Sequence, residues 1–479
     1  MNLFRVTDPF VLSIFGASGD LARIKIFPAL YELALQKRLP KKFSIFGYAR
    51  TKKTNEEFRR EFQHSVERAH PDVQRKILEP LLEKLFYFSG QYDDSKDFER
   101  FAKKVLKATA QKKLPHIAYL AVPPQLFFSI TENLAGVQGK ISSDFRVIIE
   151  KPFGDDEQSA RELFHHVSRF FPEDKVYLLD HYLGKNGVLS LLPLRYANSI
   201  LNTLLNGHLI SNIQVTAVED LSVDNRISYF DRTGIIKDMV QSHLLQILAL
   251  ITMDLPVEQS CSSIHREKFS ILSALKIRGY EKAFALGQHE SYRLIKGVKK
   301  SSKTATFAAL RLFIDRQEWY RVPIYIRTGK MLQKKHTYIV IEFRPRRIQR
   351  NDERVQPNRM IIEMYPEEKI HFRLYTNVGG GKDQFRDITT TQSIACYGDD
   401  CLTEHGRLLL DVFKGDHCNF LNFEEIIATW RLTDKITKFA KEKKVPVTIY
   451  KKKSEGPEEQ HLVPANDGFA WFDVPLEEK

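Results

Sequence analysis

The 479-residue chain contains little cysteine and no long apolar run. Its four cysteines are too few for a disulfide framework in a chain of this length, so we expect free thiols in a reducing, cytoplasmic setting. They are Cys261, Cys396, Cys401 and Cys418. Every apolar run is shorter than the roughly 18 residues that a membrane helix requires. The first residues also lack the three regions of a signal peptide, so we expect neither a membrane segment nor a secretory segment.

Internal repeats and extended low-complexity linkers are missing as well. Hydrophobic residues make up 43% of the chain and charged residues 28%, which is close to the globular average and excludes wholesale disorder and collagen-like repeats. A chain of this length has room for two or three domains with a sizeable core.

The charge is strongly positive, because 73 lysines and arginines face 60 acidic residues, which gives a net charge of +13. Such an excess suits anionic ligands, either nucleic acid or phosphorylated metabolites, although a solvated basic surface has the same composition. The late lysine cluster at 441–453 contains few aromatic residues of the kind that stack on bases. Charge alone does not choose between these ligands, so a basic nucleic-acid-binding protein stays an alternative, although we expect no nucleic-acid partner.

The first part of the chain alternates short apolar runs with amphipathic segments. Runs typical of strands lie at 11–15, 43–46, 116–122, 146–149 and 176–179. Apolar residues occur at helical spacing from position 21 onward and again at 56–70. The acidic residues at 155–157 favour the start of another helix. This alternation predicts an α/β domain with a doubly wound, Rossmann-type parallel sheet over residues 1–185.

The second part has a different pattern. Alternating, β-rich stretches occur at 213–218, 305–315, 338–343 and 369–375, and helical stretches lie near 239–252 and 424–440. We expect residues 186–479 to form a larger α+β domain with a mostly antiparallel sheet.

A glycine-containing turn separates the first predicted strand from the first predicted helix. Its sequence, Gly16-Ala17-Ser18-Gly19-Asp20-Leu21-Ala22, follows the pattern G-x-x-G-x-x-A, a variant of the dinucleotide fingerprint. Glycines there allow backbone N–H groups to approach a diphosphate at the helix N-terminus. Two glycines also occur in turns with no ligand, and the strand–helix context is what favours a cofactor site.

The second predicted strand ends with a cation. An NAD site usually has an acidic residue there for the ribose hydroxyls, whereas this chain has Arg50 followed by a threonine. A guanidinium pairs well with a phosphate, so Arg50 favours NADP. An exposed loop arginine is the alternative interpretation.

Several segments resemble the glucose-6-phosphate dehydrogenase family. The first signature consists of residues 14–22 followed by Gly47-Tyr48-Ala49-Arg50. The second is Glu150-Lys151-Pro152-Phe153-Gly154, and the third is Asp180-His181-Tyr182-Leu183-Gly184-Lys185. The resemblance continues in order through 229–231, 234–243, 266–268, 327–330 and 408–413, and it covers nearly the whole chain. It implies a homodimer or homotetramer.

The resemblance implies a reaction and a catalytic pair. The family oxidises D-glucose 6-phosphate at C1 to 6-phospho-D-glucono-1,5-lactone with NADP as hydride acceptor, the first step of the oxidative pentose phosphate pathway. His243 corresponds to the base that takes the C1 hydroxyl proton, and Asp180 to the residue that orients its ring. Histidine suits this role because its pKa is near neutral. From the residues alone, His243 shares a helical face with Met239 and Ile247, and a core histidine is the alternative.

The resemblance also implies ligand-binding residues. Positions matching the family's substrate site are Lys151, His181, Tyr182, Lys185, Glu219, Asp238, Lys330 and Lys335. Positions matching its cofactor site are Gly16, Ala17, Ser18, Gly19, Asp20, Leu21, Ala22, Arg23, Arg50 and Lys151. Among these, Lys151 is implied to bridge the sugar and the nicotinamide, and Asp238 could equally cap the helix that carries His243.

The chain departs from the family pattern at several positions, none of which removes a proposed base or phosphate ligand. The departures are Leu178-Leu179 for Arg-Ile, Asn186 for Glu, Lys237 for Arg, Ser242 for Asn, His405-Gly406 for Tyr-Glu and Arg23 for Lys. They bear on affinity, sugar selectivity and regulation.

Other functions remain open. The chain could be a hexose-6-phosphate dehydrogenase with another sugar or with NAD, or a catalytically weak regulatory homologue. The spacing of Cys396, Cys401 and His417-Cys418 matches no zinc pattern, and no metal is expected.

Overall fold

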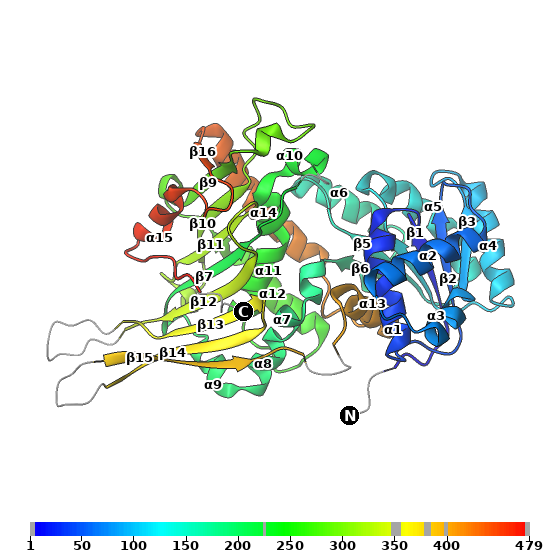
Figure 1. Cartoon of the computed structure of the whole chain (residues 1–479), viewed down its shortest axis with the longest axis horizontal. Coiled ribbons are helices and arrows are strands. Elements are labelled where there is room, and N and C mark those ends of the chain that lie inside the picture. Colours follow the sequence, from blue (N-terminus) through cyan, green and yellow to red (C-terminus); the bar gives the residue numbers. More distant parts are fainter. Residues whose placement is uncertain (1–4, 224–226, 346–355, 378–384, 397–400, 475–479) are drawn as a thin grey trace. The chain divides into compact units, whose positions relative to one another are not determined.

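The computed structural model describes residues 5–223, 227–345, 356–377, 385–396 and 401–474, and its chain divides into two compact units (Figure 1). Unit 1 comprises Met1–Lys185, Ser260–His265 and Cys396–Ile427, and unit 2 comprises Asn186–Gln259, Arg266–Ala395 and Ala428–Lys479. The sequence analysis placed 260–265 and 396–427 in the second domain. The structure assigns both segments to unit 1, because they contact residues of that unit that are distant in the sequence. The order of residues along the chain does not reveal such contacts.

The sheet of unit 1 confirms the predicted Rossmann-type architecture. In the described residues its strands run parallel in the order β3-β2-β1-β4-β5-β6, as expected for a doubly wound sheet. The strands are β1 (Phe10–Phe15), β2 (Phe43–Ala49), β3 (Leu85–Ser89), β4 (His116–Leu120), β5 (Phe145–Glu150) and β6 (Val176–Leu179). β1 and β4 are buried along their whole length, because helices cover both faces of such a sheet.

Two sets of helices pack beside this sheet (Figure 1). One set contains α1 (Phe27–Leu35), α2 (Asn55–Ala69), α3 (Arg75–Leu82) and α13 (Glu404–Lys414), and the other contains α4 (Ser95–Ala108), α5 (Phe127–Ile141) and α6 (Glu157–Ser168). The predicted helix start at 155–157 is confirmed, because Asp156 caps α6 by accepting a hydrogen bond from the backbone N–H of Ser159 at 2.8 Å. Short helical turns also occur before the chain enters unit 2, at η1 (Ala22–Ile26), η2 (Pro124–Leu126), η3 (Glu173–Lys175) and η4 (His181–Gly184).

Unit 2 contains the larger sheet. Its path is β15-β14-β13-β12-β7-β11-β10-β9-β16, with β8 paired to β10, and only the β7–β11 and β9–β16 pairs are parallel among the described strands. The bounds are β7 (Ile210–Val218), β8 (Leu275–Lys276), β9 (Phe284–His289), β10 (Phe307–Ile314), β11 (Ile324–Gly329), β12 (His336–Phe343), β13 (Arg359–Tyr365), β14 (Lys369–Asn377), β15 (Phe385–Ser393) and β16 (Val447–Tyr450). The expected α+β unit with a mostly antiparallel sheet is therefore confirmed.

The helices of unit 2 include a segment, η6 (Ile236–Leu244), that is not a regular α-helix. They are α7 (Asn186–Leu189), α8 (Leu191–Ala197), α9 (Ser199–Leu204), α10 (Ile227–Ile235), η6 (Ile236–Leu244), α11 (Leu245–Thr252) and α15 (Leu462–Ala465), and α12 (Cys261–Ala274) and α14 (Phe423–Glu442) begin in unit 1. The turns of η6 are π-helical, and such turns occur often at functional sites. By length and composition Tyr229–Thr252 could cross a membrane, but most of it is buried in the protein like a core helix, and Gly234 breaks it with a φ of +66°.

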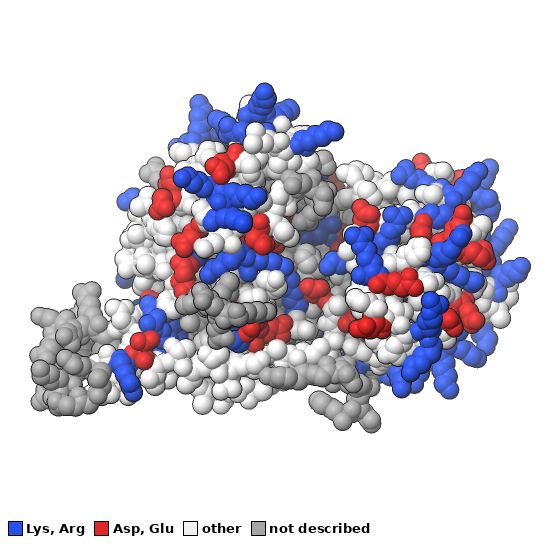
Figure 2. All heavy atoms as spheres, viewed as in Figure 1, with Lys and Arg blue, Asp and Glu red and all other residues white. Residues whose placement is uncertain are grey.

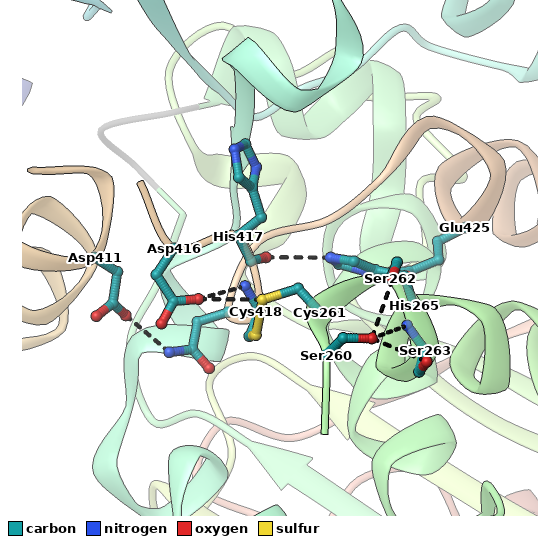
Figure 3. The surroundings of a disulfide bond; sticks show 11 residues. Ser260, Cys261, Ser262, Ser263, His265, Asp411, Asp416, His417, Cys418 and Glu425 are labelled. Atoms are coloured by element: carbon teal, nitrogen blue, oxygen red, sulfur yellow. Dashed lines mark hydrogen bonds and ion pairs between the residues drawn. A yellow bond between two sulfur atoms is a disulfide. The ribbon is translucent and has the colours of Figure 1, made fainter. Parts of the chain in front are cut away.

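The cysteines are paired, which corrects the expectation of free thiols. Cys261, at the start of α12, forms a disulfide with Cys418, and Cys396 forms one with Cys401 (Figure 3 shows the first). Their Cα atoms are 4.5 Å and 5.5 Å apart, within the range of disulfides. Because Cys261 and Cys418 are 157 positions apart in the chain, their spacing gives no sign of the pairing.

The loop that carries Cys418 is anchored by its neighbours in unit 1 (Figure 3). His265 contacts the carbonyl oxygen of His417 through Nε2 at 3.2 Å and the carboxylate of Glu425 through Nδ1 at 2.7 Å. The same loop pairs with β6 through Leu421 and Leu178, and the ring of His417 stacks on Tyr177 at 3.8 Å. The segment 416–421 therefore packs directly on the strand that leads to Asp180.

Positive and negative side chains are mixed on the face of each unit that Figure 2 shows. Figure 2 shows lysine and arginine side chains interspersed with acidic ones on the visible face of each unit. This distribution does not resemble the continuous basic stripe that follows a nucleic-acid backbone.

Candidate active site

The glycine-containing turn lies where the sequence predicted it, between β1 and the first helical turns. Gly16 has a φ of +89°, and a Cβ atom added to it would lie 2.1 Å from the carbonyl oxygen of Ala121, so only glycine fits. Its N–H donates to the carbonyl of Tyr48 at 2.9 Å, and the N–H of Gly19 donates to the carbonyl of Gly16 at 2.9 Å. Ala22 begins the π-helical η1, so this turn also precedes a helix N-terminus.

The other predicted cofactor residues differ in exposure. Ala17 and Ala22 are buried, whereas Ser18, Gly19 and Leu21 are half-buried and Asp20 is exposed. The Arg23 guanidinium lies 4.0 Å from the Asp20 carboxylate and 3.8 Å from that of Glu61, so carboxylates already face its charge.

Arg50 is exposed, and its guanidinium lies 5.7 Å from the ring centre of Tyr92. It has no ion pair among the residues that the structure describes. Burial raises the pKa of the Tyr92 phenol, and the nearby Arg50 charge and a hydrogen bond with the Gly16 backbone oppose that shift. Tyr92 thus connects the turn to Arg50. Tyr92 was not predicted as a site residue, because the segment around it has no recognisable sequence pattern.

Lys151 directly follows β5, at the carboxyl edge of the sheet where open α/β folds bind ligands. The Lys151–Pro152 peptide bond is cis, which the sequence could not show. Just before it, Tyr119 at the end of β4 donates its phenol hydrogen to the Glu150 carboxylate.

The four predicted site residues of the third signature lie in η4 or directly beside it. Asp180 is fully buried and accepts a hydrogen bond from the N–H of Tyr182 at 2.9 Å, which starts the turn. The Lys185 ammonium lies 3.4 Å from the centre of the Tyr182 ring, and the His181 ring meets the same ring edge to face at 5.1 Å. A cation, an imidazole and a phenol are therefore gathered beyond β6, as the sequence predicted.

In unit 2, three predicted substrate residues form one cluster. The Lys330 ammonium lies 2.5 Å from the Glu219 carboxylate and 3.3 Å from that of Asp238. Glu219 follows β7 and Lys330 follows β11, and these parallel neighbours are in register at Val218 and Gly329. Lys330 is only 2% exposed, and two carboxylates offset the cost of burying its charge.

His243 lies in η6, five residues after Asp238, and is 3% exposed. The predicted pairing of His243 with Asp180 joins residues of different units and stays a prediction. Lys335 lies near Tyr365, with its ammonium 4.2 Å from the ring centre.

The residues of unit 1 fit a dinucleotide cofactor. The glycine at position 16 allows a close approach to the backbone, a helix N-terminus follows it, and an exposed arginine ends β2. This set of donors suits a diphosphate and an adenosine ribose. The described residues that would hold the group are the turn at 16–22, Arg50 and Lys151.

Comparisons with known proteins agree with this architecture. Residues 13–189 match the glucose-6-phosphate dehydrogenase NAD-binding domain, and residues 192–472 match the C-terminal domain of the same family. The chain is 33% identical to glucose-6-phosphate 1-dehydrogenase of Gluconobacter oxydans, over 99% of this chain and 100% of that protein. It is 33% identical to the chloroplastic glucose-6-phosphate 1-dehydrogenase 3 of Arabidopsis thaliana, over 98% of this chain and 81% of that protein.

Solved structures show the same similarity. A glucose-6-phosphate dehydrogenase in complex with its substrate glucose-6-phosphate superposes with a TM-score of 0.90 at 30% identity, over 99% of this chain and 100% of that one. Matches of this extent to both domain models, to full-length relatives and to a solved structure lead to one conclusion. The chain belongs to the glucose-6-phosphate dehydrogenase family.

Proposed function

We propose that the protein oxidises D-glucose 6-phosphate at C1 to the 1,5-lactone, with NADP as the hydride acceptor. The observation that carries this proposal is the buried cluster of Lys330, Glu219 and Asp238. The family resemblance assigns all three to the sugar site, and the fold joins Glu219 to Lys330 across 111 residues of sequence. The similar structure of a glucose-6-phosphate dehydrogenase with its substrate bound supports the same substrate.

In the proposed reaction His243 accepts the proton of the C1 hydroxyl. Loss of that proton makes departure of the C1 hydrogen as hydride easier, and a histidine has a suitable pKa for the transfer near neutral pH. Asp180 is proposed to orient the imidazole and to stabilise its protonated form. When bound, the nicotinamide ring accepts the hydride.

The sugar phosphate is proposed to bind at η4. Lys185 supplies a positive charge, and the His181 ring and the Tyr182 phenol supply hydrogen-bonding groups for a dianion. Lys330 and Lys335 are proposed to lie at the same end of the substrate. Glu219 and Asp238 would accept hydrogen bonds from sugar hydroxyls, since their carboxylates are already oriented by Lys330.

The preference for NADP over NAD is proposed from Arg50. Its guanidinium is exposed at the end of β2, and no carboxylate neutralises it among the described residues. An acidic side chain, which would repel a 2′-phosphate, is missing from that position. We further propose a homo-oligomer and a cytoplasmic location.

The test is reduction of the nicotinamide, followed by absorbance with purified protein. Glucose 6-phosphate is compared with other hexose 6-phosphates, and NADP with NAD, under otherwise equal conditions. Fast reduction with glucose 6-phosphate and NADP supports the proposal. Faster turnover of another sugar phosphate would assign a related dehydrogenase, and ligand binding without turnover would indicate a regulatory homologue.

A further inference from the structure

The first turn of α13 brings a histidine against the carboxyl edge of the parallel sheet in unit 1. His405 is 5% exposed, and its Nε2 lies 3.7 Å from Oε1 of Glu150. The same Glu150 oxygen accepts the phenol hydrogen of Tyr119. Burial and the adjacent Glu150 raise the pKa of Tyr119 well above its ordinary value, so the phenol keeps its proton and remains a donor. One carboxylate oxygen thus accepts a hydrogen bond from Tyr119 and has the His405 ring nitrogen 3.7 Å away.

Glu150 precedes Lys151, which the family resemblance assigns to both the substrate site and the cofactor site. Glu150 is the last residue of β5, and Lys151 follows it with no intervening residue. β4 and β5 are parallel neighbours in register at Leu120 and Ile149, so Tyr119 fixes Glu150 from the adjacent strand. The Glu150 side chain is therefore attached to the backbone residue directly before Lys151.

The first turn of α13 also contacts the sugar-phosphate signature. A Cβ atom added to Gly184 would lie 2.7 Å from the carbonyl oxygen of Glu404, so η4 and α13 are in close contact. His405 and Glu404 are consecutive, and the first turn of α13 therefore lies against both Glu150, the residue before Lys151, and η4.

The start of α13 is built differently here from the family pattern, which has Tyr-Glu in place of His405-Gly406. A Cβ atom at Gly406 would lie 2.5 Å from Oε2 of Glu32. The Glu32 carboxylate accepts hydrogen bonds from the Thr403 N–H at 2.9 Å and from the Thr403 hydroxyl at 2.6 Å. The glycine thus leaves space for Glu32 to bind Thr403 at the start of the helix.

We propose that His405 is a positioning residue for the nicotinamide half of the cofactor site. It holds the Glu150 carboxylate together with Tyr119, and so fixes the Lys151 turn in the geometry that binds the dinucleotide. This role rests on the proposed function, because it is assigned through Lys151. His405 itself touches neither the substrate nor the cofactor.

The test compares His405→Phe, which keeps a ring but loses the polar nitrogen, with His405→Gln, which keeps a donor. NADPH affinity is measured by fluorescence titration, and kcat and KM for NADP are measured separately. His405→Phe is expected to weaken NADPH binding and to lower kcat/KM by about tenfold, since small displacements of a positioned group cost this much or more. His405→Gln is expected to recover most of the loss.

Thr403→Ala is the matched control, because it removes a cap of the same helix without touching Glu150. It is expected to lower the melting temperature at least as much as His405→Phe, with NADPH affinity unchanged. Wild-type affinity in His405→Phe, or an equal loss of affinity in Thr403→Ala, would overturn the proposal. If the wild type bound NADPH but turned over no sugar phosphate, the proposed function would fail while the titration still tested His405.

Discussion

The Lys330 ammonium lies 2.5 Å from the Glu219 carboxylate, although the two residues are 111 positions apart in the chain. The pairing follows from the sheet, because Glu219 and Lys330 extend two adjacent parallel strands that are in register. Asp238 completes the cluster from a π-helical segment that also carries His243. A strand pair and one irregular helix therefore gather the groups of unit 2 that are proposed to bind the sugar.

Removal of the central cation should disrupt sugar binding and stability together. In Lys330→Met the two carboxylates lose their partner, so we expect the free energy of unfolding to fall by about 3–5 kcal/mol, as for other broken buried ion pairs. The KM for glucose 6-phosphate should rise by about tenfold or more, which corresponds to roughly 1.4 kcal/mol or more of lost binding. Lys334→Met is the control, because the Lys334 ammonium donates only to the carbonyl of Val474. An unchanged KM in Lys330→Met would remove Lys330 from the site.

Arg50 should determine the choice between the two dinucleotides. Arg50→Gln is expected to raise the KM for NADP by about 10- to 100-fold, because a charge-assisted hydrogen bond contributes about 1.5–3 kcal/mol. The KM for NAD should change little, since NAD has no 2′-phosphate. Arg60→Gln makes the same change of net charge on an exposed position of α2, and kinetics with both cofactors compare the two variants. Equal losses with NADP and NAD would contradict the assignment.

The disulfide between Cys261 and Cys418 should be detectable in the purified protein. After equilibration with oxidised glutathione and denaturation, a thiol assay is expected to find no free thiols, and all four after reduction. Cys261→Ser should lower the free energy of unfolding of the oxidised protein by about 2–4 kcal/mol, the usual contribution of a disulfide. The same substitution should have a much smaller effect under reducing conditions. Four reactive thiols in the oxidised sample would restore the original expectation of free cysteines.

Acid should destabilise the protein partly through His116. This histidine is fully buried, and its Nε2 lies 2.7 Å from the hydroxyl oxygen of Ser13. Burial lowers the pKa of His116 to about 3. The unfolded chain binds the proton near pH 6.5, so the contribution of His116 is present above that pH and is lost as the pH falls toward 3. Between pH 6.5 and pH 5 the loss is about 2 kcal/mol. Urea unfolding at both pH values should show that His116→Asn loses less free energy of unfolding between pH 6.5 and pH 5 than the wild type does. Equal losses in the two proteins would contradict a buried, neutral His116.

Much of the fold was predictable because local patterns determine it. Buried runs on parallel strands, the acidic start of α6 and the alternating stretches of unit 2 all lie where the sequence placed them. β3 was missed, because its segment Leu85–Ser89 is short and largely aromatic. The π-helical turns of η6 were also missed, since the spacing of Met239 and His243 fits a regular helix equally well.

Features that depend on contacts between distant segments were not predictable. The return of 260–265 and 396–427 to unit 1, the Cys261–Cys418 bond and the approach of His405 to Glu150 join residues far apart in the chain. The site residues themselves came from family signatures. What the structure adds is how they are grouped within each unit, with Lys330 between two carboxylates and Lys185 over Tyr182.

The most direct test of the proposed chemistry is turnover of glucose 6-phosphate with NADP by the wild type and by His243→Asn. Removal of a general base typically lowers the rate by about two to four orders of magnitude, so we expect kcat to fall by at least about 100-fold in the variant. The KM for glucose 6-phosphate should change much less, because His243 acts on the proton rather than on the phosphate. A His243→Asn enzyme with near wild-type kcat would contradict the assignment of His243 as the base.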